Sequence, residues 1–464
     1  MCPGGLFVAI ATARRDGHDF VADAFQNGAR AALVARVPSA LQHEVEHGLT
    51  GALDFRAGAG GAAVGRPMAP QSAPSGTRDA IATARLLLLV DDPLRALQGC
   101  ATWWRRRHRA RVLAVAGAVG KTTTKELLAN ILQQRYRTLR TPGNFNNELG
   151  LPITLLQLTP EHEVVALEIG ISEVGEMATF GAIAGAEVAV MTRIVPEHME
   201  QLGDLDSVER EEGRLIEALP AHGVAVLNRD DPRVARMAQR TAARVVWFGE
   251  SAGAGVRATG IEARGLEGLS FDIQIADLAP RRVHLPLVGR HFVTAALAAA
   301  AAALAVGCTW EDVLSGLSQA PAAQRLAARR LPGGVTLLDD AYNASPDSTK
   351  AALDVLGSLA GRRIALLGDM LELGAYASPA HREVGEHVPG RADVLVTVGA
   401  MGREIARAAR TAGAPAAGVH ECDSTAEAIS LLPGILRRGD TLLVKGSHSM
   451  HLEVVVQALS HADG

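Results

Sequence analysis

A glycine-rich turn that joins a short apolar run to a helix-like segment has the residues needed to bind phosphate. It lies between the apolar run Val112–Ala116 and the amphipathic segment Thr124–Leu132. Glycines let backbone amides approach phosphate oxygens, and the N-terminus of the following helix adds partial positive charge. A lysine there would reach the terminal phosphates of a nucleotide, and a threonine hydroxyl would ligate Mg²⁺. The residues predicted to do this are Gly117, Gly120, Lys121, Thr122 and Thr123.

The alternative is an ordinary turn between a strand and a helix. The run Gly117–Thr122 is shorter than the full G-x-x-x-x-G-K-[ST] pattern of a phosphate loop. Its position after an apolar strand and before a helix nevertheless favours phosphate binding.

Two polar residues follow predicted strands of the same sheet. Glu168 comes directly after the apolar run Val164–Leu167, and His198 lies a few residues after Val188–Met191. The carboxyl ends of parallel strands line the ligand crevice of such a sheet. We therefore expect both side chains to face the phosphate loop and to hold Mg²⁺, directly or through water. A single glutamate or histidine is otherwise more often structural.

Three polar loops follow predicted strands later in the chain. They are Asp339–Ser348, Gly368–Gly374 and Lys445–Met450. Loops rich in Asp and Asn usually do no more than turn the chain. Because each of these follows a strand, we expect the three to face one cleft between domains, with a nucleotide or hinge role for the first.

The composition predicts a globular protein without features for binding nucleic acid or spanning a membrane. The chain of 464 residues is 48% hydrophobic and 21% charged, with a net charge of −4 and 3% aromatic residues. This charge gives no electrostatic attraction for nucleic acid. No apolar run reaches the ~18 residues needed to span a bilayer, and no signal peptide is visible. Because the four cysteines show neither metal-ligand spacing nor a disulfide framework, we expect a cytoplasmic protein.

Short apolar runs alternate with helical segments over most of the chain, which predicts an α/β fold with parallel sheets covered by helices. We expect three domains, at residues 1–108, 109–318 and 319–464, with a flexible insertion rich in Gly, Ala, Pro and Ser at about 51–79. The further strands that we expect are Leu6–Ile10, Ala31–Val34, Leu86–Val90, Val224–Leu227, Val245–Phe248, Val335–Asp339, Ile364–Leu367, Val394–Val398 and Leu442–Val444. The further helices that we expect are Phe20–Gly28, one from Pro93, Thr294–Val306 and one from near His451.

Several stretches spread over nearly the whole chain share the pattern of one enzyme family. The earlier ones read P-G-G-L-F-V-A, D-G-H-D-F-V, G-K-T-T-T-K-E, and G-N-F-N-N-E-L-G-L-P at Gly143–Pro152. The later ones read D-D-A-Y-N-A-S-P-D-S, L-G-D-M-L-E-L-G and V-K-G-S. In these motifs the chain resembles the Mur ligase family.

The resemblance implies three domains, which bind a UDP sugar, ATP, and the incoming amino acid or dipeptide. The central one would be a P-loop ATPase domain with a parallel sheet, and the last a Rossmann-like domain. The later motifs are similar to those of the member that joins D-alanyl-D-alanine to UDP-MurNAc-tripeptide. In that reaction ATP phosphorylates the tripeptide carboxylate, and the amine of the dipeptide attacks the acyl phosphate. The resemblance thus implies ATP and Mg²⁺, these two substrates and a role in peptidoglycan synthesis, and we expect a monomer.

The resemblance also implies roles for residues at matching positions. The catalytic residues would be Lys121, His198 and Glu212, and the metal-site residues Thr122, Glu168 and His198. Beyond the phosphate loop, the residues that would contact ATP are His291, Arg325 and Asp340. The residues on the UDP-sugar side would be Asn144 and Asn147, and those on the dipeptide side Asn343, Asp369, Glu372 and Lys445.

The chain departs from the family pattern at several places. The family's opening segment, with its uridine-side Ser and Arg, is missing, so we expect a first domain that is truncated at its start. Phe292 and Ala295 replace both asparagines of the adenine-side motif G-R-H-N-x-x-N, and Arg193 stands where the family has another asparagine. The lysine that the family carbamylates aligns with Glu212.

These departures leave alternatives open. One is a degenerate homologue that binds a nucleotide or a partner without catalysis, and another is a related ligase with a different amine substrate. Glu212 also has two interpretations. Its carboxylate could supply the charge of the lysine carbamate near a second Mg²⁺, or it could belong to a solvated acidic helix face with Glu209 and Glu211 nearby.

Overall fold

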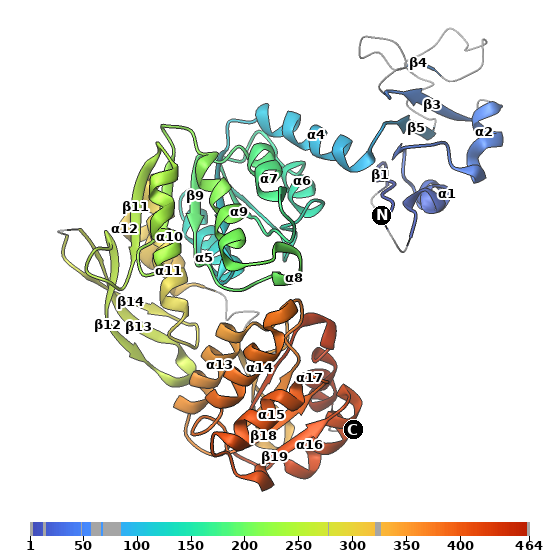
Figure 1. The fold of residues 1–464 in the computed structure, drawn as a ribbon. Coiled ribbons are helices and arrows are strands. Elements are labelled where there is room, and N and C mark those ends of the chain that lie inside the picture. Colours follow the sequence, from blue (N-terminus) through green and yellow to red (C-terminus); the bar gives the residue numbers. More distant parts are fainter. Residues whose placement is uncertain are drawn as a thin grey trace. The chain divides into compact units, whose positions relative to one another are not determined.

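The computed structural model describes residues 3–12, 15–47, 49–56, 66–67, 85–276, 278–320 and 326–461. Its contacts divide the chain into two compact units. The first comprises Met1–His108 with Glu148–Gln157, and the second comprises Arg109–Asn147 with Leu158–Gly464. Both units combine sheets with covering helices, which confirms the α/β fold class (Figure 1).

The first unit is built on one sheet. Its strands are β1 (Leu6–Val8), β2 (Ala31–Val34), β3 (Thr50–Asp54), β4 (Arg66–Pro67) and β5 (Arg85–Leu89), and its helices are α1 (Val21–Gln26), α2 (Gln42–Glu46), α4 (Pro93–Arg106) and α6 (Gly150–Leu155). Among the described residues the strand order is β1-β2-β5-β3-β4, and all neighbours are parallel except β3 and β4. The core of this unit packs β2 and β5 against α1, with Ala32, Leu87 and Phe25 among the buried residues.

The prediction of a flexible insertion at residues 51–79 is wrong at the start of this range. Residues 51–54 belong to β3, which pairs with β5, and Ala52 is buried. A small residue suits this strand because a Cβ on Gly51 would lie 3.2 Å from the side chain of Leu86. Residues 57–65 and 68–79 of the expected insertion lie outside the described residues.

Among its described residues the second unit contains two sheets, and the larger one carries the glycine-rich turn. Its strands are β6 (Arg111–Ala116), β7 (Thr138–Arg140), β8 (Val164–Glu168), β9 (Val188–Met191), β10 (Val224–Asn228), β11 (Arg244–Gly249), β12 (Val256–Ala263), β13 (Leu269–Ile275) and β14 (Arg281–Leu285). Within the described part of the chain the order is β14-β13-β12-β11-β10-β9-β6-β8-β7. Neighbours from β7 to β12 are parallel, whereas β13 and β14 are antiparallel additions. The helices are α5 (Lys121–Gln133), α7 (Glu176–Ala184), α8 (Met199–Leu202), α9 (Leu205–Glu217), α10 (Pro232–Arg236), α11 (Phe292–Ala305) and α12 (Trp310–Ser318).

Burial explains which of these strands could be predicted. Both faces of β6 are buried, with Val112, Leu113 and Ala114 all fully enclosed, so the strand reads as a continuous apolar run. β14 buries Val283 and Leu285 on one face and exposes the residues between and before them. The alternating pattern of β12–β14 was therefore missed by a search for apolar runs.

The smaller sheet has helices on both faces. Its strands are β15 (Ala327–Arg330), β16 (Thr336–Asp340), β17 (Arg363–Gly368), β18 (Val394–Val398), β19 (Val419–Cys422) and β20 (Thr441–Lys445), and its helices are α13 (Pro346–Ser358), α14 (Ala377–His387), α15 (Gly402–Thr411), α16 (Thr425–Ile435) and α17 (Glu453–Ser460). The order among described residues is β15-β16-β20-β17-β18-β19, with only the β15–β16 pair antiparallel. Successive residues of β17, such as Leu366 and Leu367, belong to different core clusters. Helices α13–α15 contribute to one cluster and α16–α17 to the other, which gives a doubly wound sheet.

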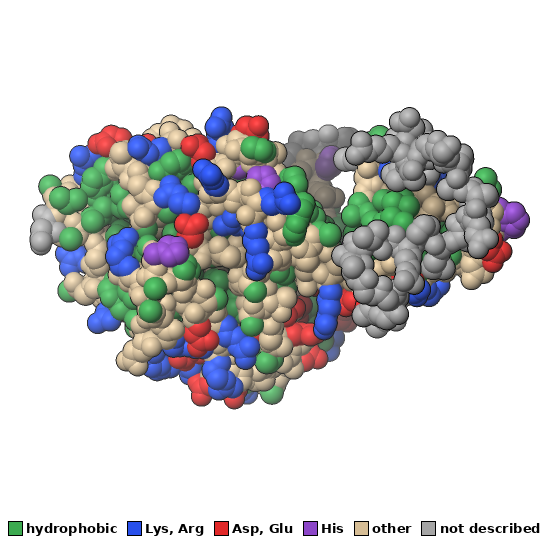
Figure 2. Space-filling model, turned by 90° about the horizontal axis from the view of Figure 1, so that it is seen from above, with side chains coloured by type: hydrophobic (Ala, Val, Ile, Leu, Met, Phe, Trp, Pro, Cys, Tyr) green, Lys and Arg blue, Asp and Glu red, His purple; other side chains and the backbone are tan. Residues whose placement is uncertain are grey.

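The surface shows no large area of one charge on the face drawn in Figure 2, where described Lys, Arg, Asp and Glu side chains are interspersed. In the described part of the chain no helix combines the length and the hydropathy that a membrane span requires. The boundaries at residues 108 and 318 fall between α4 and β6 and between α12 and β15, and the division into three domains remains a proposal.

Candidate active site

The glycine-rich turn runs from the end of β6 into the first turn of α5. Gly117 and Gly120 have φ angles of +113° and +91°, which residues with a side chain rarely adopt. A Cβ on Gly117 would lie 2.4 Å from the Oγ1 of Thr192, so no larger residue fits there. Helix α5 begins at Lys121, three residues earlier than predicted, and therefore places Lys121 and Thr122 in its first turn.

Lys121 is surrounded by carboxylates. Its Nζ lies 3.1 Å from the Ala118 carbonyl oxygen and 3.1 Å from Oε2 of Glu197. Burial alone would lower the pKa of Lys121, but the negative charges of Glu197 and Glu212, together with Glu168, outweigh it and raise the pKa above its usual value. The ammonium is therefore charged at neutral pH and is held by an acid of the protein itself.

Glu197 was missed in the sequence. It precedes His198 in the loop after β9, and β9 is a direct neighbour of β6, so its loop ends beside the glycine-rich turn. The same strand-end argument that selected His198 could have selected Glu197. It was overlooked because the resemblance marks only the histidine of that segment.

Glu168 is enclosed at the carboxyl end of β8. Its Oε1 accepts hydrogen bonds from Oγ1 of Thr122, at 2.9 Å, and from Nδ2 of Asn146, at 2.8 Å. Its Oε2 is buried and has no hydrogen-bond partner among the described residues. A buried carboxylate oxygen without a donor is costly, and its place beside the glycine-rich turn suits a cation.

The asparagine that reaches Glu168 is Asn146, which the sequence did not single out. Asn144 and Asn147, which it did, are exposed in the same loop. A Cβ on Gly170 would lie 2.9 Å from Nδ2 of Asn146, so the glycine leaves room for this amide.

Glu212 lies under the glycine-rich turn, not on a solvated face. Its side chain is 2% exposed, and its Oε2 accepts the backbone N–H of Gly117 at 2.9 Å. Burial raises the pKa of Glu212 to about 7, although the charge of Lys121 and the Gly117 hydrogen bond lower it. Glu211 is equally buried and accepts the N–H of Gly175, at the start of α7, at 2.7 Å. The solvated acidic face is therefore wrong for both residues, because Glu212 faces the glycine-rich turn and Glu211 faces the start of α7.

The raised pKa of Glu212 predicts a pH-dependent stability of the nucleotide-free protein. The folded state holds a proton on this carboxyl between its ordinary pKa of 4.5 and about 7, where the unfolded state has lost it. Protonation thus stabilises the fold, fully below pH 4.5, and this contribution is lost as the pH rises through about 7. Glutamine at position 212 stays neutral throughout. The urea midpoint of the wild type should therefore fall relative to that of Glu212→Gln as the pH rises across this range, and parallel pH profiles would contradict the assignment.

The side chains of His198 and Glu372 contact each other and do not form two separate sites. Nδ1 of His198 lies 2.8 Å from Oε2 of Glu372. Both residues have positive φ angles, 51° and 63°, which side-chain-bearing residues adopt only where surrounding contacts hold them. The described residues include no cluster of three His, Cys, Asp or Glu side chains that could hold a metal. The structure thus brings together one residue expected at a metal and one expected on the dipeptide side.

Three further predicted residues meet at the ends of β16 and β20. Asp340 and Lys445 are register partners on these parallel strands, and Nζ of Lys445 lies 2.5 Å from Oδ2 of Asp340. The same Nζ donates to the backbone oxygen of Asn343 at 2.9 Å. Asp369 behaves differently, because its Oδ1 accepts the N–H of Gly402 at 2.7 Å and so caps the start of α15.

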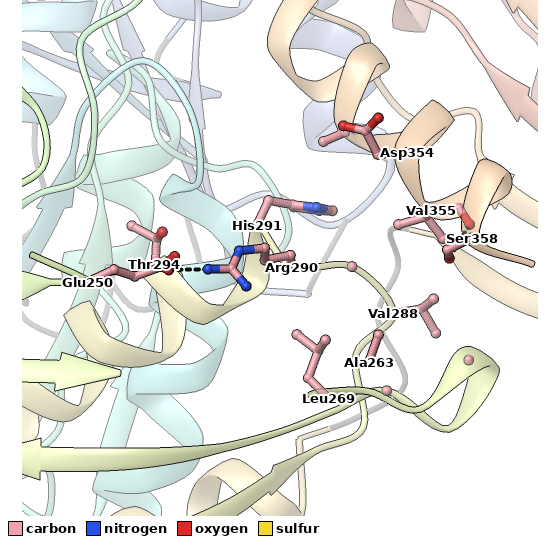
Figure 3. Close-up of a pocket in the computed structure, with 14 residues that line it drawn as sticks. Glu250, Ala263, Leu269, Val288, Arg290, His291, Thr294, Asp354, Val355 and Ser358 are labelled. Carbon is pink, nitrogen blue, oxygen red and sulfur yellow. Dashed lines mark hydrogen bonds and ion pairs between the residues drawn. The ribbon is translucent and has the colours of Figure 1, made fainter. Parts of the chain in front are cut away.

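A pocket of about 390 Å³ opens beside the start of α11 (Figure 3). Figure 3 shows the ring of His291 extending toward the side where α13 carries Asp354 and Ser358, while Arg290 pairs with Glu250. Neither Phe292 nor Ala295 lines the pocket, because both residues are buried in the hydrophobic core against which α11 packs. Arg325, which was expected to contact ATP, lies outside the described residues.

The chain is similar to known proteins over nearly its whole length. The models of the Mur ligase middle domain and of the Mur ligase, glutamate ligase domain match residues 115–303 and 324–448. The UDP-N-acetylmuramoyl-tripeptide–D-alanyl-D-alanine ligase of Escherichia coli (strain K12) is 34% identical over 465 residues, which cover 99% of this chain and 91% of the relative. The ligase of the same name from Mycobacterium tuberculosis (strain H37Rv) is 35% identical over 487 residues, which cover 98% of this chain and 90% of the relative.

Solved structures with the same architecture include MurF from Acinetobacter baumannii. It superposes with a TM-score of 0.81 at 29% identity and covers 99% of this chain and 91% of its own. MurF from Thermotoga maritima, solved in complex with ADP, has a TM-score of 0.78 at 24% identity, and the match covers 99% of this chain and 94% of its own. Because two family models and relatives at 34% and 35% identity match this chain over most of its length, the chain belongs to the Mur ligase family.

Proposed function

We propose that the protein is an ATP-dependent, ADP-forming ligase that joins D-alanyl-D-alanine to UDP-MurNAc-tripeptide in peptidoglycan synthesis. The observation that carries this proposal is the near-complete match, at 34–35% identity, to relatives that are named for this reaction. The glycine-rich turn with Lys121 and Thr122 at the start of α5 supports the use of ATP. We place the enzyme in the cytoplasm, where its nucleotide-linked substrate would be made, and we expect it to act as a monomer.

The chemistry would proceed in two steps. The γ-phosphate passes from ATP to a carboxylate oxygen of the tripeptide, and ADP leaves. The amine nitrogen of the dipeptide then attacks the carbonyl carbon of the acyl phosphate, and the C–N bond forms as phosphate departs. Lys121 would hold the transferring phosphoryl group and offset the charge that a carboxylate and a triphosphate bring together.

The residues beside the turn fit Mg²⁺ as the accompanying cation. Oxygen donors are the ligands that Mg²⁺ prefers, and the buried Oε2 of Glu168 lacks a partner among the described residues. Three carboxylates, those of Glu168, Glu197 and Glu212, act on the single charge of Lys121, so a triphosphate would meet excess negative charge there. Glu168 and Thr122 would hold the ion, with His198 through water, and the ion would supply positive charge to the phosphates.

The remaining roles are proposals that follow from position. The pocket at His291 would take the nucleotide base, with Arg325 and Asp340 on the side of the last domain. Asn144 and Asn147 would lie on the UDP-sugar side. Asn343, Glu372 and Lys445 would contact the dipeptide side, whereas the carboxylate of Asp369 is already engaged at α15 and would act on that side by shaping its loop.

The amine substrate can be tested directly. With UDP-MurNAc-tripeptide and ATP present, phosphate release should be fastest with D-alanyl-D-alanine, because the later motifs of the chain match relatives that use this dipeptide. The panel should include D-alanine, L-alanyl-L-alanine, L-lysine and D-glutamate. A single amino acid that gives a higher kcat/KM than the dipeptide would place the chain with another member of the family.

A second candidate is a homologue that binds nucleotide without catalysis. The ion pair between Lys121 and Glu197 favours it, since the lysine is not free for phosphate in this conformation. ATP hydrolysis that depends on the tripeptide substrate separates the two candidates. ADP binding without any such hydrolysis would support the non-catalytic one.

A further inference from the structure

A second lysine of α5 is completely buried, and the reaction described above does not use it. Lys125 lies one helical turn after Lys121, and its side chain is 0% exposed. Its Nζ donates to the backbone oxygen of Thr141 at 2.9 Å and to that of Gly143 at 3.5 Å, and it pairs with Glu126. Removing an ammonium from water costs several kcal/mol unless close partners compensate for it. The position of this charge therefore calls for an explanation.

The backbone that Lys125 holds leads directly to the carboxylate of Glu168. Thr141 contacts β8 twice, because its N–H donates to the Ala166 carbonyl at 3.0 Å and its Oγ1 accepts the N–H of Glu168 at 2.9 Å. Five residues later Asn146 donates to Oε1 of Glu168. The segment from Thr141 to Asn146 thus fixes both the backbone and one oxygen of Glu168.

The other end of the same segment is also fixed. The backbone oxygen of Asn146 accepts the N–H of Gly170 at 2.9 Å, two residues past Glu168. Because Oε1 already accepts hydrogen bonds from Thr122 and Asn146, only the second oxygen of the carboxylate remains for a further partner. That oxygen is the buried Oε2 that has no partner among the described residues.

A simpler explanation is that Lys125 only balances the charge of Glu126. Arg140 already does so from the exposed side, with Nη1 3.0 Å from Oε2 of Glu126. A buried lysine is not needed for that task. What distinguishes Lys125 from Arg140 is its contact with the two carbonyl oxygens of the segment that leads to Glu168.

We propose that Lys125 is a positioning residue that anchors the Thr141–Asn146 segment, so that this segment aims the free oxygen of Glu168 at a divalent cation. The proposal rests on the proposed function in taking that cation to be one that accompanies the nucleotide. Residues that orient a metal ligand typically change metal affinity by ~10–100-fold when they are mutated. Lys125 does not touch Glu168 itself but acts on it through the Thr141–Asn146 segment, so we expect an effect at the lower end of this range.

The test measures ADP binding to the full chain by calorimetry, with and without Mg²⁺, for the wild type and three variants. Lys125→Gln removes the charge, and Thr141→Val removes the hydroxyl that orients Glu168 with little change in shape. Arg140→Gln is the matched control, because it removes the other cation on Glu126. Thermal unfolding of each variant shows whether it is folded.

We expect Lys125→Gln to raise the Mg²⁺ concentration needed for half-maximal tightening of ADP binding by ~10-fold, and Thr141→Val to raise it by at least ~3-fold. ADP affinity without Mg²⁺ should stay within about twofold in both, since the glycine-rich turn is untouched, and Arg140→Gln should match the wild type. A folded Lys125→Gln variant with the wild-type Mg²⁺ response would overturn the proposal. If that variant does not fold, Thr141→Val decides in the same way. If the wild-type protein shows no ligation of the dipeptide although its ADP binding responds to Mg²⁺, the proposed function is refuted and this inference stays intact.

Discussion

Lys121→Ala is expected to lower kcat for ligation by ~10²–10³-fold while leaving the fold intact, because one preorganised contact to a charged transition state has that magnitude. Lys121 is the cation of the glycine-rich turn, with its Nζ held at the loop by the Ala118 carbonyl oxygen. Its side chain contributes little to the core, since it ends among carboxylates. The measurement is steady-state phosphate release with UDP-MurNAc-tripeptide, ATP and D-alanyl-D-alanine, together with a thermal unfolding curve. Turnover close to that of the wild type would remove the assignment of this loop to phosphate.

The companion variant for this experiment is Glu197→Gln. It keeps a side chain of the same size and a hydrogen bond to Nζ of Lys121, but it removes the charge that competes with phosphate for the lysine. ADP should therefore bind this variant more tightly than the wild type, in the direction opposite to Lys121→Ala. If Glu197→Gln and Lys121→Ala both weakened ADP binding, Glu197 would be a partner of the nucleotide complex and not a competitor.

The strands of the parallel sheets and the helix starts beside them could be predicted well, because the apolar runs and capping residues in the sequence agree with what the fold buries there. β9 occupies Val188–Met191 as expected, since both faces of that strand are covered. Helix α4 begins at Pro93 because Asp92 accepts the N–H groups of Leu94 and Arg95, and proline suits the first helical position. Such signals are local, so no knowledge of the tertiary fold is needed to recognise them.

The parts that could not be predicted depend on which distant segments meet. Nothing near Glu212 in the sequence shows that α9 turns this residue toward Gly117, 95 positions away, so its acidic neighbours suggested a solvated face. Asn146 reaches Glu168 across a distant segment, where the glycine at position 170 leaves room for its amide. The contact of His198 with Glu372 joins loops that lie far apart in the chain. Motif matching located Glu212, His198 and Glu372 but not Asn146, and the partners of all four came from the fold.

Glu212 is one of the positions at which the chain departs from the family pattern, and its burial makes a strong test possible. At the position where the resemblance implies a carbamylated lysine, this chain has a carboxylate that accepts the Gly117 N–H and faces the charge of Lys121. With a pKa of about 7 in the nucleotide-free protein, the carboxyl is only partly ionised at neutral pH. Added positive charge, as from a cation that accompanies ATP, would favour the ionised form. We therefore expect Glu212 to supply anionic charge under the turn without carbon dioxide.

Two results should follow from this role of Glu212. Turnover should not respond to added bicarbonate, because no carbamate has to form. Glu212→Ala should lower kcat by at least ~10²-fold, since it leaves the Gly117 N–H without its partner and removes a charge beside Lys121. Glu211 is unsuitable as the inert control, because it caps α7 through the N–H of Gly175. Glu217→Gln serves instead, since Glu217 lies on the same helix, is half exposed and pairs with Arg240. Equal turnover in Glu212→Ala and Glu217→Gln, or activation by bicarbonate, would leave Glu212 as a structural acid and place the required charge on another residue.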